Sequence, residues 1–440
     1  MASDGNNRIA GFFRSAMRIE PNELKATVVA FMFIFSLTFA YNILKPVRDA
    51  MAPDWSDVSV ALLWTYNFFF SVAAVSLYGL AASKLKLRHL VPGVYAFFAI
   101  SFVLFYAGSR YTGQADYVDK AFYVWISVFS LFHVSVFWSL MSDVFSKAQA
   151  PRLFAFIASG ASIGTIAGSA ATLALAGVLG SMNLMLLAAL IMVSIVPAIG
   201  ILQRLKSSEL QPGAVSAEAD RNAIVRGNPL SGFSQFLLNP YLLGIAVFIF
   251  LYTAIGSFAY FEIKNLLEEF DRDARAQIWA GINLTVNSLA IVTALFATSR
   301  IATRFGLATT LALVPVAVAV GFLLVAVNPL LSAVIVIWVV LKAGNYAITR
   351  PAREMLYTTV DREARFKAKP VIDIVVYRGG DSLAGWAFAG LTTGLGLGLG
   401  PVAIVGALIA LAWAYVGIRL GRQYDRPDTA ATVTAGARTG

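Results

Sequence analysis

Long apolar runs separated by short polar segments dominate this sequence. A helix needs about 20 predominantly apolar residues to cross the hydrocarbon core of a bilayer. Windows of that length fall into twelve segments, six in each half of the chain. Their centres lie near residues 37, 70, 100, 133, 166, 192, 250, 288, 316, 343, 384 and 410. The pattern predicts an all-α integral membrane protein with twelve transmembrane helices.

Polar stretches divide this array into regions. A polar lead-in covers residues 1–25, a charged stretch covers 207–235 between the halves, and a polar tail covers 425–440. We therefore expect two six-helix bundles, at 26–206 and 236–424, joined by a linker. The lead-in is basic and lacks the form of a cleaved signal peptide, so the first apolar run is expected to stay as a helix.

The positions of lysine and arginine predict the orientation of the spans, because cytoplasmic loops are enriched in these residues. With twelve spans, every basic cluster falls on one side of the membrane. The clusters are Arg8 to Lys25, Lys84/Lys86/Arg88, Lys147/Arg152, Arg204 to Arg226, Arg300/Arg304, Arg362 to Lys369 and Arg419/Arg422/Arg426. The loops on the other side are rich in aspartate and glutamate. Both termini are therefore predicted to be cytoplasmic.

Composition supports this class and excludes others. Hydrophobic residues make up 58% of the chain and charged residues 13%, which is outside the range of soluble proteins. The net charge of +10 is explained by basic cytoplasmic loops, so we expect no nucleic acid partner. With no cysteine and only His89 and His133, thiol chemistry and a histidine metal site are not expected. We expect no cofactor and no enzymatic activity, since no nucleophile and base stand together.

An internal repeat carries the charges that lie inside the predicted spans. Tyr41–Asp49 on span 1 matches Tyr346–Glu354 on span 10, with the shared pattern Tyr-x-Ile-x-(Lys/Arg)-Pro-x-Arg-(Asp/Glu). Spans 1, 4, 7 and 10 begin four three-helix units in the major-facilitator arrangement. A match between spans 1 and 10 is typical of inverted three-helix repeats, so the chain resembles that fold.

Two groups of charges lie at opposite ends of the spans, because odd spans run outward and even spans inward. Lys45, Arg48, Asp49, Glu262 and Lys264 fall at the outer ends of spans 1 and 7. A charge at the bilayer centre costs about 2.5–3.5 kcal/mol, so such residues usually face a partner or a cavity. We interpret this group as an outer gate. The alternative is that the two lysines only snorkel to the interface or hold helices together by ion pairs.

The second group lies at the inner ends of spans 4, 10 and 11, and we interpret it as an inner gate. Its members are Asp143, Arg350, Arg353, Glu354, Arg378 and Asp381. Lys342 stands near the middle of span 10. Rocking of the bundles would break one gate while the other forms, and an anionic substrate would compete with the carboxylates for the arginines.

Two further features suggest how these helices pack. Gly160, Gly164 and Gly168 form a small-residue ladder on span 5, which favours close helix packing. Pro46 and Pro351 are expected to free backbone carbonyls near the charged groups. The prolines are also compatible with simple tolerance near the ends of spans.

Four motifs resemble the ATP/ADP translocase family (nucleotide transporter, Tlc-type) of plastids and intracellular bacteria. They are Lys45-Pro-Val-Arg48-Asp49, Arg350-Pro-Ala-Arg353-Glu354-Met355-Leu-Tyr357, Lys367-Ala-Lys369-Pro-Val-Ile372-Asp373 and Arg378-Gly-Gly-Asp381-Ser. The resemblance implies exchange of nucleoside triphosphate for diphosphate and phosphate, or nucleotide uptake, without a covalent cofactor. It assigns roles to Arg48, Glu262, Arg353 and Glu354. It also implies a bacterial cytoplasmic (inner) membrane.

Two departures from the family pattern concern the substrate. The ATP/ADP exchangers are similar to Lys-Asp-Thr where this chain has Arg48-Asp49-Ala50, and they carry Gly-Lys-Ser where it has Gly380-Asp381-Ser382. The second departure reverses a charge in the expected path, which questions nucleoside triphosphate exchange but leaves transport of an anionic solute in place.

The sequence thus predicts a monomeric secondary transporter of a small anionic solute, with a nucleotide or phosphate as the expected substrate and the lipid bilayer as its surroundings. Two alternatives stay open. One is a major-facilitator carrier of a smaller organic anion, peptide or metabolite. The other is a membrane scaffold or sensor that transports nothing.

Overall fold

A computed structural model describes residues 19–84, 87–146, 149–210, 239–296, 298–360 and 372–425. Most of the predicted lead-in (1–25), linker (207–235) and tail (425–440) lies outside the described residues, as do the basic cluster from Arg362 to Lys369 and the cations Lys86, Lys147 and Arg426. Within the described ranges every regular element is a helix, which confirms the all-α prediction.

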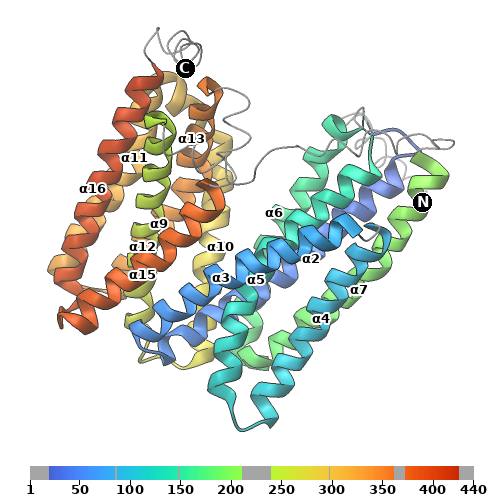
Figure 1. The fold of residues 1–440 in the computed structure, drawn as a ribbon, viewed down its shortest axis with the longest axis horizontal. Coiled ribbons are helices and arrows are strands. Elements are labelled where there is room, and N and C mark those ends of the chain that lie inside the picture. The colour runs from blue at the N-terminus through green and yellow to red at the C-terminus, as the bar shows by residue number, and fades with distance from the viewer. Residues whose placement is uncertain are drawn as a thin grey trace, which may run out of the picture. The chain divides into compact units, whose positions relative to one another are not determined.

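The long helices follow one another along the whole chain (Figure 1). They are α2 (Leu24–Met51), α3 (Asp57–Lys84), α4 (Leu87–Tyr111), α5 (Ala115–Val144), α6 (Ala150–Leu179), α7 (Leu184–Leu205), α9 (Pro240–Leu266), α10 (Arg272–Phe296), α11 (Thr298–Val327), α12 (Leu331–Gly344), α13 (Arg350–Leu356), α15 (Tyr377–Ala389) and α16 (Leu399–Tyr424). A short 3-10 helix, η1 (Ala52–Asp54), follows α2.

Each of the twelve predicted span centres falls inside one of these helices. Among the described residues, ten helical segments are long and apolar enough to cross a membrane. The other two predicted spans are α10 and the segment around α15. Both are more polar than the other helices, because α10 contains Asn283 and Asn287 besides its charged first turn, while α15 is short and carries Arg378 and Asp381.

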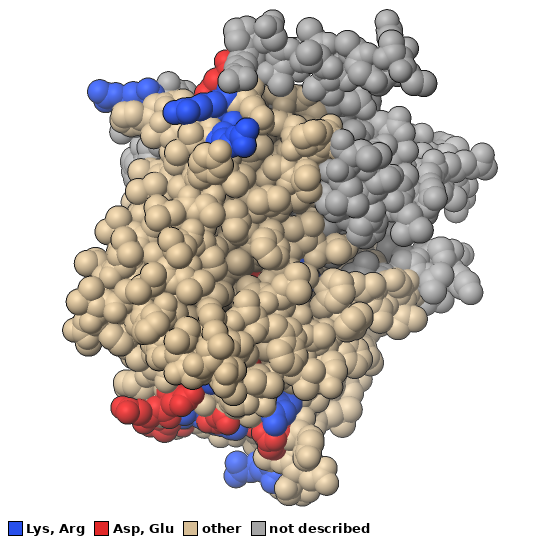
Figure 2. Space-filling model, turned by 60° about the vertical axis from the view of Figure 1, so that its left-hand side comes forward, with Lys and Arg blue, Asp and Glu red and all other residues tan. Residues whose placement is uncertain are grey.

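Charged side chains are unevenly distributed over the face shown in Figure 2. On the face shown in Figure 2, lysine, arginine, aspartate and glutamate gather at two opposite ends, and the broad belt between them is uncharged at its surface. Large apolar side chains such as Leu324, Val320 and Leu408 are more than half exposed in the described helices. An apolar belt between polar ends is the surface that a lipid bilayer requires.

The helices form two compact units whose limits differ from the two halves of the sequence. Unit 1 comprises Met1–Met51, Phe69–Ile224 and Asp271–Leu284. Unit 2 comprises Ala52–Phe68, Val225–Phe270 and Thr285–Gly440. The division runs through the middle of α3 and of α10, so the first half of each of these helices packs in a different unit from its second half.

Unit 1 is centred on the contact between α2 and α6, which lie side by side in Figure 1. A Cβ atom added at Gly160, Gly164 or Gly168 of α6 would approach within 2.8 Å of a backbone carbonyl oxygen of α2. The three glycines therefore let the two backbones touch, and the predicted close packing is confirmed. Helices α4 and α7 also pack together in this unit.

Pro46 lies inside α2, which continues through it without interruption. A proline has no amide hydrogen, so the carbonyl four residues earlier, that of Asn42, lacks its usual helical partner. The hydroxyl of Thr172 on α6 donates a hydrogen bond to this carbonyl at 3.4 Å. A neighbouring helix thus satisfies the group that the proline frees, as happens in other membrane helices.

In unit 2, α11 packs on α16, and α9 packs on α15 and α16. Gly417 and Gly421 of α16 lie against the backbone of α11 at Leu311 and Ala308. This second small-residue contact has the Gly-x-x-x-Gly spacing of a close helix pair. Helix α9 begins with a cap in which the Asn239 side chain accepts hydrogen bonds from two backbone amides.

Three π-helical turns interrupt the helices within the described residues of the last third of the chain. They are η5 (Asn345–Thr349) between α12 and α13, η7 (Ile372–Val376) before α15, and η8 (Gly390–Gly394) after α15. Such turns occur often at functional sites, and each one shifts the faces of the helix that follows. The first and second turns flank the charged residues of spans 10 and 11.

Candidate functional site

The predicted charged residues of α2 lie on one helical face in unit 1. Arg48 Nε donates to Asp49 Oδ1 at 2.9 Å, and another guanidinium nitrogen donates to the Ser127 hydroxyl at 3.0 Å. The guanidinium carbon lies 5.2 Å from the centre of the Tyr123 ring. Asp49 is buried. Arg48 is thus held by a carboxylate, a hydroxyl and an aromatic face, all within one unit.

One turn earlier, Lys45 has a different environment. Its ammonium nitrogen donates to Asn283 Oδ1 on α10 at 2.8 Å. Asn283 is a neutral side chain, so this contact supplies no countercharge to the ammonium group. Tyr41, one further turn back on the same face, stacks on His133 of α5 with ring centres 4.3 Å apart. The α2 face therefore presents an aromatic ring, an ammonium group and a guanidinium group at helical spacing.

Lys342 of α12 lies in an aromatic box in unit 2. Its nitrogen is 4.6 Å from the centre of the Trp338 ring and 5.1 Å from that of Tyr252. The Tyr252 hydroxyl is 3.4 Å from the same nitrogen. A Cβ atom at Gly256 would lie 3.3 Å from this nitrogen, so the glycine leaves room for it. Each cation–π contact contributes about 0.5–2 kcal/mol but supplies no countercharge.

Further charges of spans 10 and 11 gather near the same box. Arg353 is 8% exposed, and one of its nitrogens lies 3.4 Å from Glu354 Oε1. Arg353 and Asp381 both interact electrostatically with the Tyr252 side chain. Arg350 is exposed and Arg378 is half-buried. Unit 2 thus brings Lys342 together with an arginine and an aspartate around one tyrosine.

Lys264 is almost completely buried near the end of α9, with a side-chain exposure of 1%. Its ammonium group donates to Asp57 Oδ1 at 3.2 Å, to Asn265 Oδ1 at 2.8 Å and to Glu268 Oε1 at 3.1 Å. Thr392 also donates to Asp57, at 2.8 Å. An ammonium group has three hydrogens, so its donor capacity is filled. The sequence singled out Lys264 but not Asp57 as its partner.

The contacts within each unit differ from the predicted gate pairs. Asp143 of α5 accepts from Lys206 at 2.9 Å inside unit 1. The predicted partners of Asp143 lie in unit 2, and the predicted partners of Glu262 and Lys264 lie in unit 1. The pairing of charges across the two bundles stays a prediction.

The buried ion pair between Asp119 and Arg272 was also not predicted. Asp119 of α5 is 1% exposed and accepts from Arg272 of α10 at 2.6 Å and from Ser109 of α4 at 2.8 Å. Next to Arg272, Asp273 accepts from the backbone amide of Ser181 at 2.6 Å. The sequence placed these aspartates among the acidic loops. Their places at the starts of helices were visible, but nothing in the sequence indicated which helices meet.

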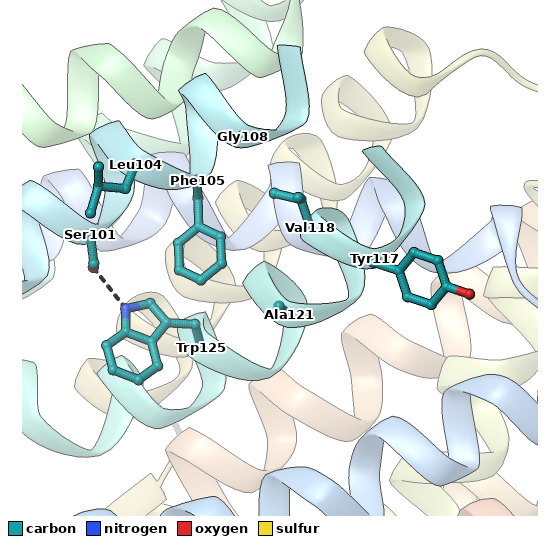
Figure 3. Close-up of a pocket in the computed structure, with 8 residues that line it drawn as sticks. All are labelled: Ser101, Leu104, Phe105, Gly108, Tyr117, Val118, Ala121 and Trp125. Atoms are coloured by element: carbon teal, nitrogen blue, oxygen red, sulfur yellow. Dashed lines mark hydrogen bonds between the residues drawn. The ribbon is translucent and has the colours of Figure 1, made fainter. Parts of the chain in front are cut away.

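An apolar groove of about 490 Å³ lies between α4 and α5, away from these charges (Figure 3). Trp125 forms one wall, and its indole nitrogen donates to the Ser101 hydroxyl at 2.8 Å. The walls include Leu104 and Tyr117, which are 65% and 73% exposed. An open apolar groove on the outside of a membrane protein suits lipid chains. We therefore take the charged clusters, and not this groove, as the candidate site.

Among the described residues, no group of histidine, aspartate and glutamate is placed to hold a metal ion.

Comparison with known families gives one match that covers most of the chain. The profile of the Major Facilitator Superfamily matches residues 27–364. No curated protein matches the chain by sequence.

Solved structures with the same fold are numerous and distant in sequence. The nucleoside transporter NupG superposes with a TM-score of 0.64 at 13% identity, covering 91% of this chain and 99% of its own. A POT family transporter solved with a thioalcohol-conjugated peptide gives a TM-score of 0.65 at 11% identity, covering 93% and 99%. A bacterial homologue of the human lysosomal transporter Spinster, in an inward-facing state, gives 0.58 at 15%, covering 92% and 96%. These similarities establish the fold.

Proposed function

The chain belongs to the Major Facilitator Superfamily, and we propose that this multi-pass secondary transporter carries a small anionic solute, specifically a nucleotide. The family match and the fold establish that the chain is a secondary transporter of this superfamily. The contacts of two lysines support the proposed anionic substrate, and aromatic neighbours and the family resemblance support a nucleotide.

Lys45 and Lys342 carry the argument for an anion. Both lie in membrane-spanning helices and are only half-buried. In the described part of the chain, the first contacts an amide oxygen and the second two aromatic side chains, and neither has a carboxylate partner. An unpaired charge at membrane depth costs a few kcal/mol, which an anionic ligand would offset. Lys264, by contrast, already holds two carboxylates.

Three features favour a nucleotide among anions. The aromatic rings of Trp338, Tyr252 and Tyr377 lie around Lys342, with the two tyrosine rings 6.2 Å apart. Aromatic rings stack with bases, and such stacking contributes about 1–3 kcal/mol per base. The motifs around Lys45 and Arg353 resemble those of the ATP/ADP translocases. NupG, one of the similar structures, is described as a nucleoside transporter.

The transport cycle proposed here is alternating access with charged gates. Lys45, Arg48, Asp49, Glu262 and Lys264 form the outer gate in this proposal. The inner gate consists of Asp143, Arg350, Arg353, Glu354, Arg378 and Asp381. A substrate phosphate that pairs with a gate cation would compete with the gate carboxylates and so link binding to opening. The proposed setting is the cytoplasmic membrane of a bacterium, with a monomeric protein and both termini in the cytoplasm.

Uptake into proteoliposomes tests this function. Purified protein is reconstituted and given labelled ATP, ADP or phosphate, with unlabelled competitors in excess. The expected result is saturable uptake that excess nucleotide abolishes. Lys342→Gln is expected to weaken apparent affinity by roughly 10–100-fold, since a hydrogen bond to a charged group contributes about 1.5–3 kcal/mol. The matched control is Arg419→Gln, which removes an exposed cation of the same unit and should transport like the parent.

Other outcomes would favour the two alternatives. Uptake of peptides or small acids that is insensitive to nucleotide would favour a smaller organic solute, as bound to the POT family transporters solved with 5-aminolevulinic acid or a peptide. Thermal stability that no nucleotide or anion changes, together with a silent Arg353→Ala substitution, would favour a scaffold or sensor.

A further inference from the structure

Glu262 is the buried acidic residue that the contacts above leave unexplained. It lies in the last two turns of α9, and its relative exposure is 0%. Neither of its carboxyl oxygens has a hydrogen-bond partner among the described residues. Its helix neighbour Lys264 directs its three hydrogens to Asp57, Asn265 and Glu268.

Every other fully buried carboxylate of the described residues has a strong donor. Asp49 is held by Arg48 and Asp119 by Arg272. Glu23 accepts two hydrogen bonds from Arg152, at 2.8 and 3.1 Å. Buried charges in proteins are normally paired in this way, because an ionised carboxylate without a partner loses its hydration and gains nothing in return. Glu262 departs from this rule.

The neighbouring carboxylate Asp57 increases the penalty for ionising Glu262. Charged or titratable groups on the elements that pack against α9 are Asp54 of η1, Asp57 of α3, Lys342 of α12, Tyr377, Arg378 and Asp381 of α15, and Tyr415, Arg419, Arg422 and Tyr424 of α16. Of these, Asp57 interacts electrostatically with Glu262. Lys264, Asp57 and Glu268 together carry a net charge of −1 when ionised. A second negative charge beside them is disfavoured.

We propose that Glu262 is a proton-binding site that couples transport to proton movement. The carboxylate takes one proton from water on the side to which it is exposed, giving a neutral acid, which is the form that suits its buried site in this structure. When the cycle exposes it to the other side, the acid returns the proton to water and becomes a carboxylate again. This inference rests on the proposed function, because it gives the anionic solute a proton as its cotransported partner.

A proton fits this site better than a metal cation. Sodium and other hard cations need several oxygen ligands around them. The carboxyl oxygens of Glu262 have no polar group within hydrogen-bonding distance, and no cluster of acidic residues suited to a metal occurs among the described residues. A carboxylic acid needs only the proton itself to become neutral.

The first test measures the proton directly and requires no substrate. Infrared difference spectra of the whole reconstituted protein at pH 7 compare the parent with Glu262→Gln. The expected result is loss of one protonated carboxyl band in the variant. The control, Asp116→Asn, removes an exposed, ion-paired carboxylate and should leave that band unchanged. Persistence of the band in Glu262→Gln would overturn the proposal.

The second test measures coupling in proteoliposomes with labelled nucleotide. Glu262→Gln should lose the accumulation of nucleotide that a pH gradient drives, and the exchange it retains at equal pH should no longer change with pH. Glu262→Asp, which keeps a carboxyl group, should restore part of that accumulation and also shows that the position tolerates change. Accumulation by Glu262→Gln at the parent level would overturn the proposal. If the parent moves no anion at all, the proposed function fails, and the infrared band still decides the role of Glu262.

Discussion

Replacing Gly168 by alanine is the most direct test of how unit 1 is held together. The added Cβ atom would lie 2.5 Å from the Phe39 carbonyl oxygen and 3.1 Å from Asn42 Cβ. Even close carbon–oxygen contacts in proteins are about 3.3 Å, so α2 and α6 would have to move apart by nearly 1 Å. The obstructing atom belongs to a backbone and cannot swing away.

The magnitude follows from two opposing effects. Overpacking costs about 1–3 kcal/mol, and a rigid backbone contact favours the upper end. Alanine gains about 1 kcal/mol over glycine in helix propensity. We expect a net loss of about 2 kcal/mol, or a fall in Tm of about 4–8 °C for a unit of this size. The measurement is thermal unfolding in detergent, followed by tryptophan fluorescence.

The control is Gly200→Ala on α7 of the same unit, where an added Cβ meets nothing within 4 Å. This variant should be as stable as the parent or slightly more stable. If Gly168→Ala unfolds at the same temperature as Gly200→Ala, the close approach of α2 and α6 described here is incorrect.

Three further substitutions test individual contacts. Asp57→Asn leaves the buried Lys264 ammonium with one carboxylate fewer and should lower stability by about 3 kcal/mol. Pairing it with Lys264→Gln should recover part of the loss in a double-mutant cycle, and strict additivity would speak against the ion pair. Arg272→Gln leaves the Asp119 carboxylate buried with a weaker donor and should lower stability by about 3 kcal/mol in thermal unfolding, and an unchanged Tm would speak against this ion pair. Thr172→Val removes the hydroxyl that serves the carbonyl freed by the proline of α2. We expect a loss of about 1 kcal/mol by thermal unfolding, and an unchanged Tm would show that water or lipid serves that carbonyl equally well.

The sequence was sufficient to predict the helices, because a lipid bilayer permits few other backbone structures. Backbone groups in hydrocarbon must pair within the segment, so an apolar run of sufficient length becomes a helix. The close packing at Gly164 was also predictable, since small residues four apart allow backbones to touch. The equivalent contact at Gly417 and Gly421 was not predicted, although these two glycines are also four positions apart.

The partners of the charges were not predictable in the same way. Lys264 and Asp57 are separated by 207 positions in the chain, and only the arrangement of helices brings them together. In an apolar span most faces are hydrophobic, so periodicity gives little indication of which face meets another helix. The sequence therefore identified which residues carry charge inside the membrane but not what each one contacts.

The π-helical turn η5 has a consequence for the internal repeat. Tyr41–Asp49 lies within the uninterrupted helix α2, whereas the first residues of Tyr346–Glu354 fall in η5 and the rest in α13. A turn with one extra residue rotates everything after it by about 100° around the axis. Two stretches that share one sequence pattern thus present their side chains in different directions. A duplicated motif can acquire a second role through a change in the backbone alone. Here the shared sequence pattern does not give the two motifs the same side-chain directions.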